Sequence, residues 1–415
     1  MHVVIVSDTG YVDGGAPKVA ISSAQGLAAV GLSVSYVCAT APIAPELNHP
    51  NIKVHCLNIE SVWKRSNPFA AAAQGIWNSS AKASLTKILT ALPANDTIVH
   101  FHQWTKSLSP SILAVPSTLA LPSIVSLHDY FLSCPNGAYY HFSDGVPCNE
   151  IPMSGACIAA RCDSRNSLHK AVRVARQFAT GKALKQVGDS LSVLNVTPFA
   201  KTVIDKFIPG QHRRYTVLYP VEAAREEPVA VARNREFVFV GRLTAEKGVR
   251  QLANAARQTG LPVTFVGTGP LLEEIRSHEG TISCTGWVDA NTVGSIMKRA
   301  RALVFPSNWY ETCGIVVLEA LARGIPVIAS SKTGAADFIR EGINGYLIDP
   351  ADLAALKARM TDLMDDGVAQ RMGQEAYARY WADPLTADVH VSRLLEVYQS
   401  VLSEHELRKI SQKQL

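Results

Sequence analysis

Two glutamates and the residues between them are the part of this 415-residue chain best suited to chemistry. Glu311 and Glu319 lie eight positions apart, on either side of Gly314, in the segment 308–330, NWYETCGIVVLEALARGIPVIAS. An apolar run that begins near Ile315 predicts a helix, whose free N–H groups and dipole favour an anion at its start. A carboxylate one turn into that helix can accept hydrogen bonds from neighbouring sugar hydroxyls. The segment therefore has the chemistry to bind a nucleotide through its diphosphate and its ribose.

Two cations follow a predicted buried strand at 236–240. Arg242 and Lys247 are five positions apart in the sequence GRLTAEKG. Arginine offers a planar fork and lysine a compact charge, so both suit one diphosphate group. Preorganised cations stabilise negative charge on a leaving phosphate and remove the need for a divalent metal. The chain has no Asp-x-Asp motif to bind one. The alternative is a pair of surface charges in a loop.

Together these motifs resemble those of the GT-B glycosyltransferases of family 4. The resemblance rests on the Glu-x7-Glu spacing, on the following EALARGIPVI, and on GRLTAEKG, and it is strongest over about 236–350. It implies an α/β chain of two Rossmann-like, doubly wound domains that face each other across a cleft. It also implies transfer of a sugar from a nucleotide-diphosphate sugar to an acceptor hydroxyl, with retention of anomeric configuration.

The resemblance further implies roles for single residues. Glu319 would hold the ribose hydroxyls, and Glu311 would lie near the transferred sugar. His128, at the end of a predicted strand, would face the donor sugar through its backbone carbonyl or its ring. His128, Glu311, Arg242 and Lys247 form the predicted catalytic set. The other predicted donor contacts are Gly14, Gly15, Gly267, Gly286, Trp287, Cys313, Gly314, Ile315 and Val316. Since the family often has Gly-Phe-Gly where this chain has Thr-Cys-Gly at 312–314, the donor sugar is left open.

The predicted elements place these residues at the edges of two sheets. Short buried strands alternate with helical segments, which is typical of parallel sheets covered on both faces. Ligands of such sheets bind at the carboxyl ends of the strands. We predict an acceptor-side domain over 1–220 and a nucleotide-sugar domain over 221–384. By resemblance, a helix within 385–415 should pack back on the first domain.

Composition sets the class of protein. A hydrophobic content of 47% is ample for two cores. The amino terminus lacks the pattern of a secretory signal, and the apolar stretches are broken well before the roughly 20 residues that span a bilayer. We therefore expect a cytoplasmic protein.

Positive charge gathers in a helix predicted at about 165–187. Between Arg161 and Lys185, seven Arg or Lys residues stand against the single acid Asp163. Apolar residues are interleaved at helical spacing. The pattern fits a helix that rests on an anionic membrane, such as the inner face of the plasma membrane, or that faces a polyanionic substrate. An ordinary amphipathic helix packed on its own domain fits equally well. Nucleic acid is disfavoured, because no recognition motif accompanies the charge.

Half of the eight cysteines fall in a loop-rich insertion at about 131–165. They are Cys134, Cys148, Cys157 and Cys162. In a reducing compartment such clustering favours a metal over disulfides, and four thiolates can bind Zn²⁺ tetrahedrally. The sequence thus predicts a structural zinc, with unligated thiols or an iron–sulfur cluster as alternatives.

The sequence as a whole predicts a retaining glycosyltransferase that uses a UDP- or GDP-sugar and a saccharide or lipid-linked saccharide acceptor. Cell-surface polysaccharide or lipid-linked oligosaccharide synthesis is the expected setting. Two alternatives stay open: a catalytically degenerate GT-B scaffold in a membrane-associated assembly, and a sugar-nucleotide 2-epimerase, which shares the architecture but not the Glu-x7-Glu and Arg/Lys pattern.

Overall fold

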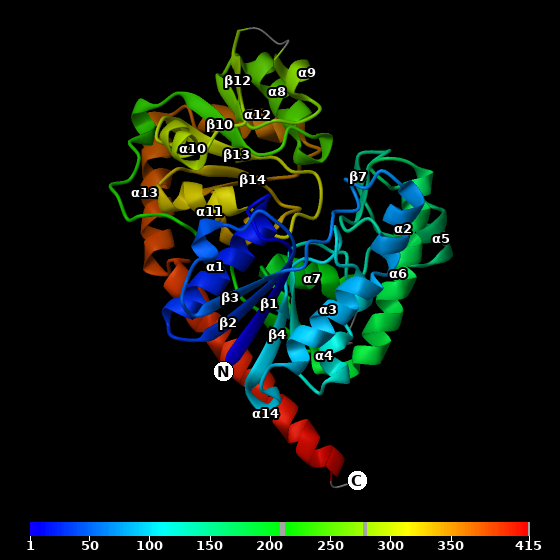
Figure 1. Cartoon of the computed structure of the whole chain (residues 1–415). Coiled ribbons are helices and arrows are strands. Elements are labelled where there is room, and N and C mark those ends of the chain that lie inside the picture. Colours follow the sequence, from blue (N-terminus) through cyan, green and yellow to red (C-terminus); the bar gives the residue numbers. More distant parts are fainter. Residues whose placement is uncertain (208–211, 277–279, 414–415) are drawn as a thin grey trace. The chain divides into compact units, whose positions relative to one another are not determined.

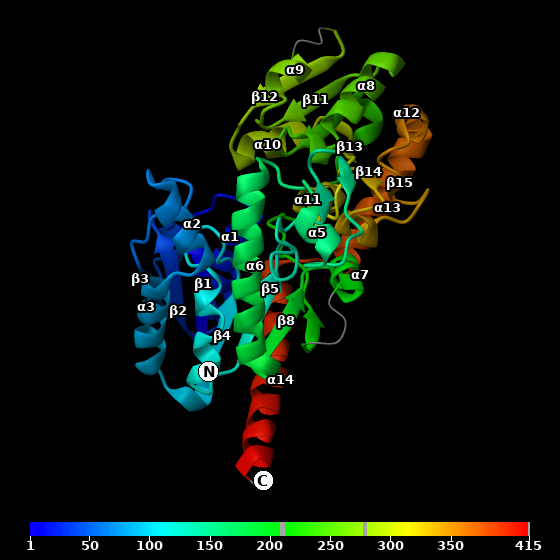
Figure 2. The same ribbon diagram turned by 90° about the vertical axis from the view of Figure 1, so that its right-hand side faces the viewer.

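The computed structural model describes residues 1–207, 212–276 and 280–413 of the chain. It divides into two compact units (Figures 1 and 2). The first unit comprises Met1–Ala138, Asn149–Pro220 and Ala387–Leu415, and the second comprises Tyr139–Cys148 and Val221–Thr386. None of the described helices is long and apolar enough to span a membrane.

The first unit is built on a seven-stranded parallel sheet with the order β3-β2-β1-β4-β5-β8-β9. Runs of Val and Ile make the central strands almost fully buried, as expected for a sheet covered on both faces. The order reverses between β1 and β4, so the segments that follow these two strands lie at a topological switch point. The strands are β1 (His2–Thr9), β2 (Ser33–Thr40), β3 (Ile52–Cys56), β4 (Thr97–Phe101), β5 (Ser123–Leu127), β8 (Leu191–Asn195) and β9 (Arg214–Thr216).

The helices of the first unit include one from the far carboxyl terminus. They are α1 (Gly15–Ala29), α2 (Pro68–Ile76), α3 (Ser79–Thr90), α4 (Val115–Thr118), α5 (Gly155–Ala159), α6 (Ser167–Val187), α7 (Pro198–Phe207) and α14 (Ala387–Lys413). Helix α14 packs on α1, where Val391, Leu394 and Tyr398 join the core of the sheet. Gly26 permits this approach, because a Cβ atom there would collide with Val391.

The second unit repeats the doubly wound pattern with a six-stranded parallel sheet in the order β12-β11-β10-β13-β14-β15. Here the order reverses between β10 and β13. The strands are β10 (Glu236–Val240), β11 (Val263–Val266), β12 (Ile282–Gly286), β13 (Ala300–Phe305), β14 (Val327–Ser330) and β15 (Gly345–Ile348). The helices are α8 (Val249–Thr259), α9 (Leu272–Arg276), α10 (Ala290–Met297), α11 (Ile315–Ala322), α12 (Leu353–Asp362) and α13 (Asp366–Ala382).

A short hairpin inside the cysteine-rich insertion groups with the second unit. It consists of β6 (Tyr140–His141) and β7 (Val146–Pro147). The sequence placed the whole insertion in the first domain. Asn308, however, donates a hydrogen bond of 2.8 Å to the Gly145 carbonyl, which ties the hairpin to the second unit.

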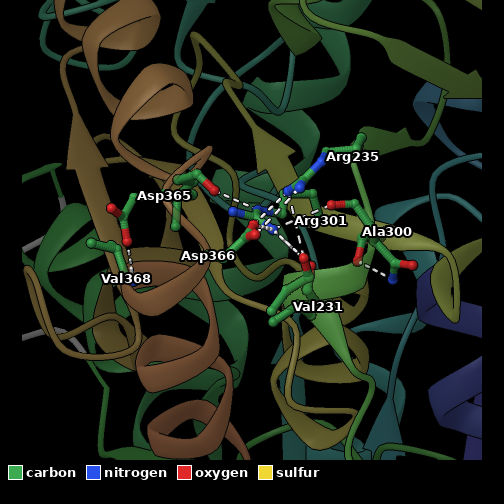
Figure 3. A network of polar contacts seen from close by, with 10 residues as sticks. Val231, Arg235, Ala300, Arg301, Asp365, Asp366 and Val368 are labelled. Carbon is green, nitrogen blue, oxygen red and sulfur yellow. Dashed lines mark hydrogen bonds and ion pairs between the residues drawn. The ribbon is translucent and has the colours of Figure 1, made fainter.

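A buried cation holds the second unit together away from the predicted site (Figure 3). Arg301 on β13 is fully buried and donates to the carbonyls of Val231 at 3.1 Å and Leu363 at 2.5 Å. Its Nη1 also lies 2.8 Å from Asp366, on which Arg235 converges as well. The charge is thus paired and hydrogen-bonded, as a buried charge must be.

Candidate active site

The reversal of strand order in the second unit brings the predicted lysine and the first predicted glutamate together. Lys247 follows β10, and Glu311 follows β13, which is the neighbour of β10 in the sheet. Lys247 Nζ lies 2.5 Å from Glu311 Oε1, and the two side chains are only 12% and 15% exposed. Since Coulombic attraction is strong where water is largely excluded, this pair fixes both side chains.

Glycines at the carboxyl ends of the strands make this close packing sterically feasible. Gly248 has φ of 73°, and a Cβ atom there would collide with the carbonyl oxygen of Pro306, just after β13. The predicted contact Gly267 has φ of 138°, and a Cβ atom there would collide with the carbonyl oxygen of Gly241. Only glycine suits both the backbone conformation and the space at these positions.

Three buried polar atoms near this pair lack hydrogen-bond partners among the described residues. They are Glu311 Oε2, Ser307 Oγ and Trp309 Nε1. Lys247 Nζ also lies 5.3 Å from the ring centroid of Trp309. A buried polar group without a partner is costly, so such atoms mark a place where a polar ligand would be stabilised. The sequence patterns did not single out Ser307 or Trp309, although both lie in the loop that leads to Glu311.

The second predicted cation differs from the first in its exposure. The side chain of Arg242 is 70% exposed, and its Nη2 lies 3.9 Å from Glu246. Glu246 is itself buried and accepts a hydrogen bond of 2.7 Å from Thr244. Lys247 is therefore held by the protein, whereas Arg242 projects into solvent from the same loop.

Helix α11 begins at the predicted position. Gly314 is its N-cap and makes no side-chain capping bond, and Ile315 and Val316 form its first turn. Glu319 is half-buried one turn further on. Burial raises the pKa of the Cys313 thiol to about 12, so that this cysteine is a neutral wall residue and no nucleophile. Of the other predicted donor contacts, Gly286 has φ of 73° and Trp287 is 77% exposed.

In the first unit, the ring of His128 is part of a buried hydrogen-bonded chain. Its Nε2 lies 2.9 Å from His102 Nδ1, and its Nδ1 lies 2.5 Å from the Tyr219 hydroxyl. Burial lowers the pKa of His128 to about 3, so the ring is neutral. With both ring nitrogens engaged, the backbone carbonyl is the group compatible with the predicted role at the donor sugar. The pattern His-Phe-His at 100–102 is the sequence signal for this chain of rings, and the prediction did not use it.

The predicted glycine-rich loop of the first unit precedes α1. Gly14 is exposed and extended, a Cβ atom there would meet nothing within 4 Å, and Gly15 opens the helix. Nearby, buried Asp8 accepts hydrogen bonds from the N–H groups of Lys106 and Ser107 at 2.8 and 2.9 Å. Asp8 thereby fixes the loop after β4 to the end of β1, at the switch point of this sheet.

All four clustered cysteines, which the sequence predicts as zinc ligands, are buried. Cys162 Sγ accepts a hydrogen bond of 3.0 Å from the ammonium group of Lys170, and Cys134 Sγ lies 3.1 Å from the Asn136 amide oxygen. Within the described residues, no group of three His, Cys, Asp or Glu side chains is arranged to hold a metal ion. Cys148 and Cys157 are buried, and neither forms a disulfide.

The basic helix α6 has an arrangement that differs from an ordinary amphipathic helix. Lys170 and Arg176 are buried, whereas Leu168 and Phe178 are 72% and 62% exposed. Burial of these two cations is tolerated because Lys170 donates to a cysteine sulfur and Arg176 donates to backbone carbonyls of neighbouring loops. Helical spacing therefore gave the two faces of α6 but not which of them is buried.

The comparisons agree with this architecture. Residues 221–379 match the family model described as Glycosyl transferases group 1. A glycogen synthase of Mycobacterium tuberculosis is 29% identical over 278 residues, which is 63% of this chain and 65% of that protein, just under two thirds of its length. An alpha-maltose-1-phosphate synthase of the same species is 27% identical over 353 residues, 79% of this chain and 84% of that protein.

Solved structures with the same fold cover nearly the whole chain. Sucrose-phosphate synthase from Thermosynechococcus elongatus superposes with a TM-score of 0.71 at 17% identity, over 97% of this chain and 99% of that one. HepE of Anabaena, solved in complex with UDP, gives 0.66 at 16% identity, over 96% and 100%. The chain therefore has the GT-B fold, and its relatives support a GT-B glycosyltransferase.

Proposed function

We propose that the protein is a retaining glycosyltransferase that transfers a sugar from a UDP- or GDP-sugar to an acceptor hydroxyl. Cell-surface polysaccharide or lipid-linked oligosaccharide synthesis is the proposed setting. The observation that carries this proposal is the Lys247–Glu311 pair at the switch point of the second sheet, with the start of α11 beside it in sequence. A diphosphate and a sugar together need the cation, the carboxylate and the free helix amides that this loop supplies.

Each residue has a distinct part in the proposed reaction. Lys247 and Arg242 stabilise the charge that develops on the leaving diphosphate as its bond to the anomeric carbon breaks. Glu311 keeps Lys247 in place through Oε1 and accepts a sugar hydroxyl hydrogen bond with the unpartnered Oε2. Glu319 binds the ribose hydroxyls. The backbone carbonyl of His128 faces the developing positive charge at the anomeric carbon.

Retention follows from attack on the face that the diphosphate leaves. The acceptor hydroxyl forms the new bond to the anomeric carbon, and its proton passes to the departing phosphate oxygen. No divalent metal is required, since the two cations and the amides of α11 supply the positive charge. HepE, a structural neighbour, was solved with UDP, and this agrees with a uridine donor.

The direct test is calorimetric titration with UDP and GDP, followed by donor hydrolysis with UDP-, GDP- and ADP-sugars, with and without EDTA. We expect micromolar-range binding of one nucleotide, and donor hydrolysis that persists in EDTA. If neither nucleotide binds, a degenerate scaffold explains the chain better. If the only product is the nucleotide sugar with inverted configuration at carbon 2, the protein is an epimerase instead. NMR of the new glycosidic bond reports retention.

Peripheral membrane association is a further part of the proposal. Leu168 and Phe178 are exposed large apolar side chains on α6, which also carries Lys182 and Lys185, both exposed. Apolar side chains with flanking lysines are suited to the surface of an anionic bilayer. Co-sedimentation with anionic vesicles should fall in Leu168→Ser/Phe178→Ser. Equal sedimentation of this variant and the wild type would remove α6 from membrane binding.

A structural zinc bound by Cys134, Cys148, Cys157 and Cys162 is a separate proposal. Elemental analysis of the purified protein tests it without any activity measurement. One zinc per chain that is lost in Cys157→Ser would establish the site in spite of the Lys170–Cys162 contact.

A further inference from the structure

A pocket between α2 and α6 of the first unit gathers positive charge. It encloses about 250 Å³, and every one of its lining residues lies in the first unit. Figures 1 and 2 show the two helices side by side. The lining of the pocket includes Arg65, Arg165, Arg173 and Arg176, and none of the lining residues is Asp or Glu. Like charges that share a partly enclosed space repel one another, so an anion bound there would be stabilised.

Two of the arginines are fixed by the protein itself. Arg173 Nε lies 3.0 Å from Asp163, whose side chain is 1% exposed. Arg176 donates to the carbonyls of Thr105 at 3.4 Å and Pro135 at 3.3 Å. Burial, and then the charge of Arg173, lowers the pKa of Arg176 to about 10, so that its guanidinium stays charged at neutral pH. The carboxyl groups of Asp129, Asp8 and Asp163 offset part of this lowering, and of these three only Asp163 is seen in an ion pair with the arginines of the pocket.

The other two arginines make no ion pair with a carboxylate of the described residues. Arg65 is exposed at the rim. The Arg165 guanidinium lies 3.9 Å from the ring centroid of Trp63. A guanidinium offers two parallel N–H groups to a phosphate, and stacking on an aromatic ring restricts the orientation of that fork. Both groups are therefore available to an incoming oxyanion.

The rest of the pocket wall is apolar or aromatic. Trp63 is 47% exposed, and Ala71, Ala72 and Val172 complete this side. The imidazole of His169 stacks 6.2 Å from Trp63. Small side chains next to an indole ring leave room for the C–H face of a sugar, which packs well against such surfaces. The wall thus suits a ring that carries the anion.

The position of the pocket connects it to the predicted acceptor side. Trp63 follows β3, and Thr105 follows β4, so both lie at the carboxyl-end edge of the first sheet. His128 follows β5 at the same edge. Ligands of doubly wound sheets bind at this edge. A ligand that enters the pocket from this edge would meet the four arginines.

We propose that this pocket binds the phosphate of a phosphorylated saccharide acceptor, with the arginines on the phosphate and Trp63 beside the sugar ring. The inference rests on the proposed transferase function and names its acceptor class. The phosphate belongs either to a soluble sugar phosphate or to the diphosphate link of a lipid-linked sugar. The shared chemistry is a phosphate oxyanion attached to a sugar.

The binding test uses glucose 1-phosphate and the uncharged methyl glucoside as probes in calorimetry with saturating UDP. The wild type should bind glucose 1-phosphate more tightly than methyl glucoside. Arg65→Gln/Arg165→Gln should weaken binding of the phosphate by about tenfold or more, because charge-assisted bidentate contacts are lost. The control Lys64→Gln/Lys87→Gln removes the same charge from exposed lysines outside the pocket and should stay within about twofold. Equal binding in both double variants would overturn the proposal.

The kinetic test compares glucose 1-phosphate with a short-chain isoprenyl diphosphate-linked glucose as acceptors. The pocket variant should raise the acceptor KM about tenfold or more, with donor hydrolysis in the absence of acceptor unchanged. The acceptor that is used identifies the source of the phosphate. Equal loss in the pocket and control variants on the lipid acceptor would indicate general attraction to a charged bilayer and would refute the pocket. If the wild type neither binds UDP nor hydrolyses donors, the transferase proposal fails, whereas the glucose 1-phosphate titration repeated without UDP still tests the pocket.

Discussion

His102 Nδ1 lies 2.9 Å from His128 Nε2, and the two rings stack with centroids 5.1 Å apart. His100 continues this group, through hydrogen bonds of 2.6 Å to the Tyr398 hydroxyl and 2.8 Å to Ser126. Since Tyr398 lies on α14, a neutral histidine cluster connects the ends of β4 and β5 to the carboxyl-terminal helix. Burial lowers the pKa of each of these three histidines.

This cluster predicts that acid destabilises the first unit at mild pH. Burial lowers the pKa of His128 to about 3, against about 6.5 in an unfolded chain. Burial also lowers the pKa of His390, a buried histidine of α14 outside the cluster, to about 4. Below pH 6.5 the unfolded chain therefore binds protons that the folded chain does not, and stability falls as the pH falls. Each histidine contributes up to about 1.4 kcal/mol per pH unit between its unfolded and folded pKa values. The Asp129 carboxyl, whose pKa burial raises to about 6, offsets part of this loss.

Urea unfolding midpoints of the first unit at pH 7.5, 6.5 and 5.5, followed through its secondary structure, check this. The urea midpoint should change little between pH 7.5 and 6.5 and should drop clearly between pH 6.5 and 5.5. His390→Asn, which keeps a hydrogen-bonding side chain but cannot titrate, should reduce the slope. A midpoint that rises toward pH 5.5 would mean that the carboxyl groups outweigh the histidines.

The Lys247–Glu311 pair predicts a large effect of removing the cation. Lys247→Ala should lower turnover by roughly two orders of magnitude or more, since a preorganised charge at the leaving diphosphate is lost. Lys298→Ala is the matched control, because Lys298 is a lysine of the same unit that pairs with Glu226 at 2.8 Å on the surface. Steady-state rates with saturating donor provide the measurement. Near-normal turnover in Lys247→Ala would remove this lysine from the mechanism.

Substitution of Glu311 should lower the rate of sugar transfer more than it weakens the binding of UDP. Glu311→Gln keeps the shape of the side chain but frees Lys247 from its ion pair and weakens the acceptor at Oε2. We expect kcat to fall by about tenfold or more with a smaller change in the affinity for UDP, because UDP lacks the transferred sugar. Calorimetry and kinetics on the same preparation test this. An equal loss of UDP affinity would place Glu311 at the nucleotide rather than at the sugar.

The location of the donor site could be predicted from the sequence, but the contacts between its side chains could not. Spacing and strand order located Lys247 and Glu311 at one switch point, because a doubly wound sheet makes β10 and β13 neighbours. The ion pair itself depends on how two loops from different strands pack, and the sequence pattern has no signal for that contact. For the same reason Ser307 and Trp309 were not recognised.

The fold shows the same limit. The strand predicted at 236–240 from a buried apolar run is observed as β10. Strand β9 and the β6–β7 hairpin were missed, since strands of three and two residues are too short to show an alternating pattern. Helix α6 was located correctly, but its buried cations are stabilised by carbonyls of distant loops, such as that of Pro135.

Arg301 predicts a large loss of stability in the second unit. Arg301→Met keeps much of the volume but leaves the carbonyls of Val231 and Leu363 without this donor (Figure 3). Buried acceptors that lose their partner cost about 1–3 kcal/mol each, so a total loss of about 3 kcal/mol or more is expected. Arg235→Met removes an exposed partner of the same Asp366 and should change stability only slightly. Similar unfolding midpoints for the two variants would show that Arg301 is not a structural anchor.

Gly26 and Gly181 provide a matched pair that tests the packing of α14. Both glycines lie inside helices, and alanine is favoured over glycine there by about 1 kcal/mol. At Gly181 a Cβ atom meets nothing within 4 Å, so Gly181→Ala should raise the unfolding midpoint of the first unit. At Gly26 a Cβ atom collides with the stiff side chain of Val391, so Gly26→Ala should lower it. In Gly26→Ala/Val391→Ala the collision is removed, and the effect of the alanine at position 26 should turn favourable in a double-mutant cycle. If Gly26→Ala stabilises the protein as much as Gly181→Ala does, α14 does not pack on α1 in solution as it does in the structure.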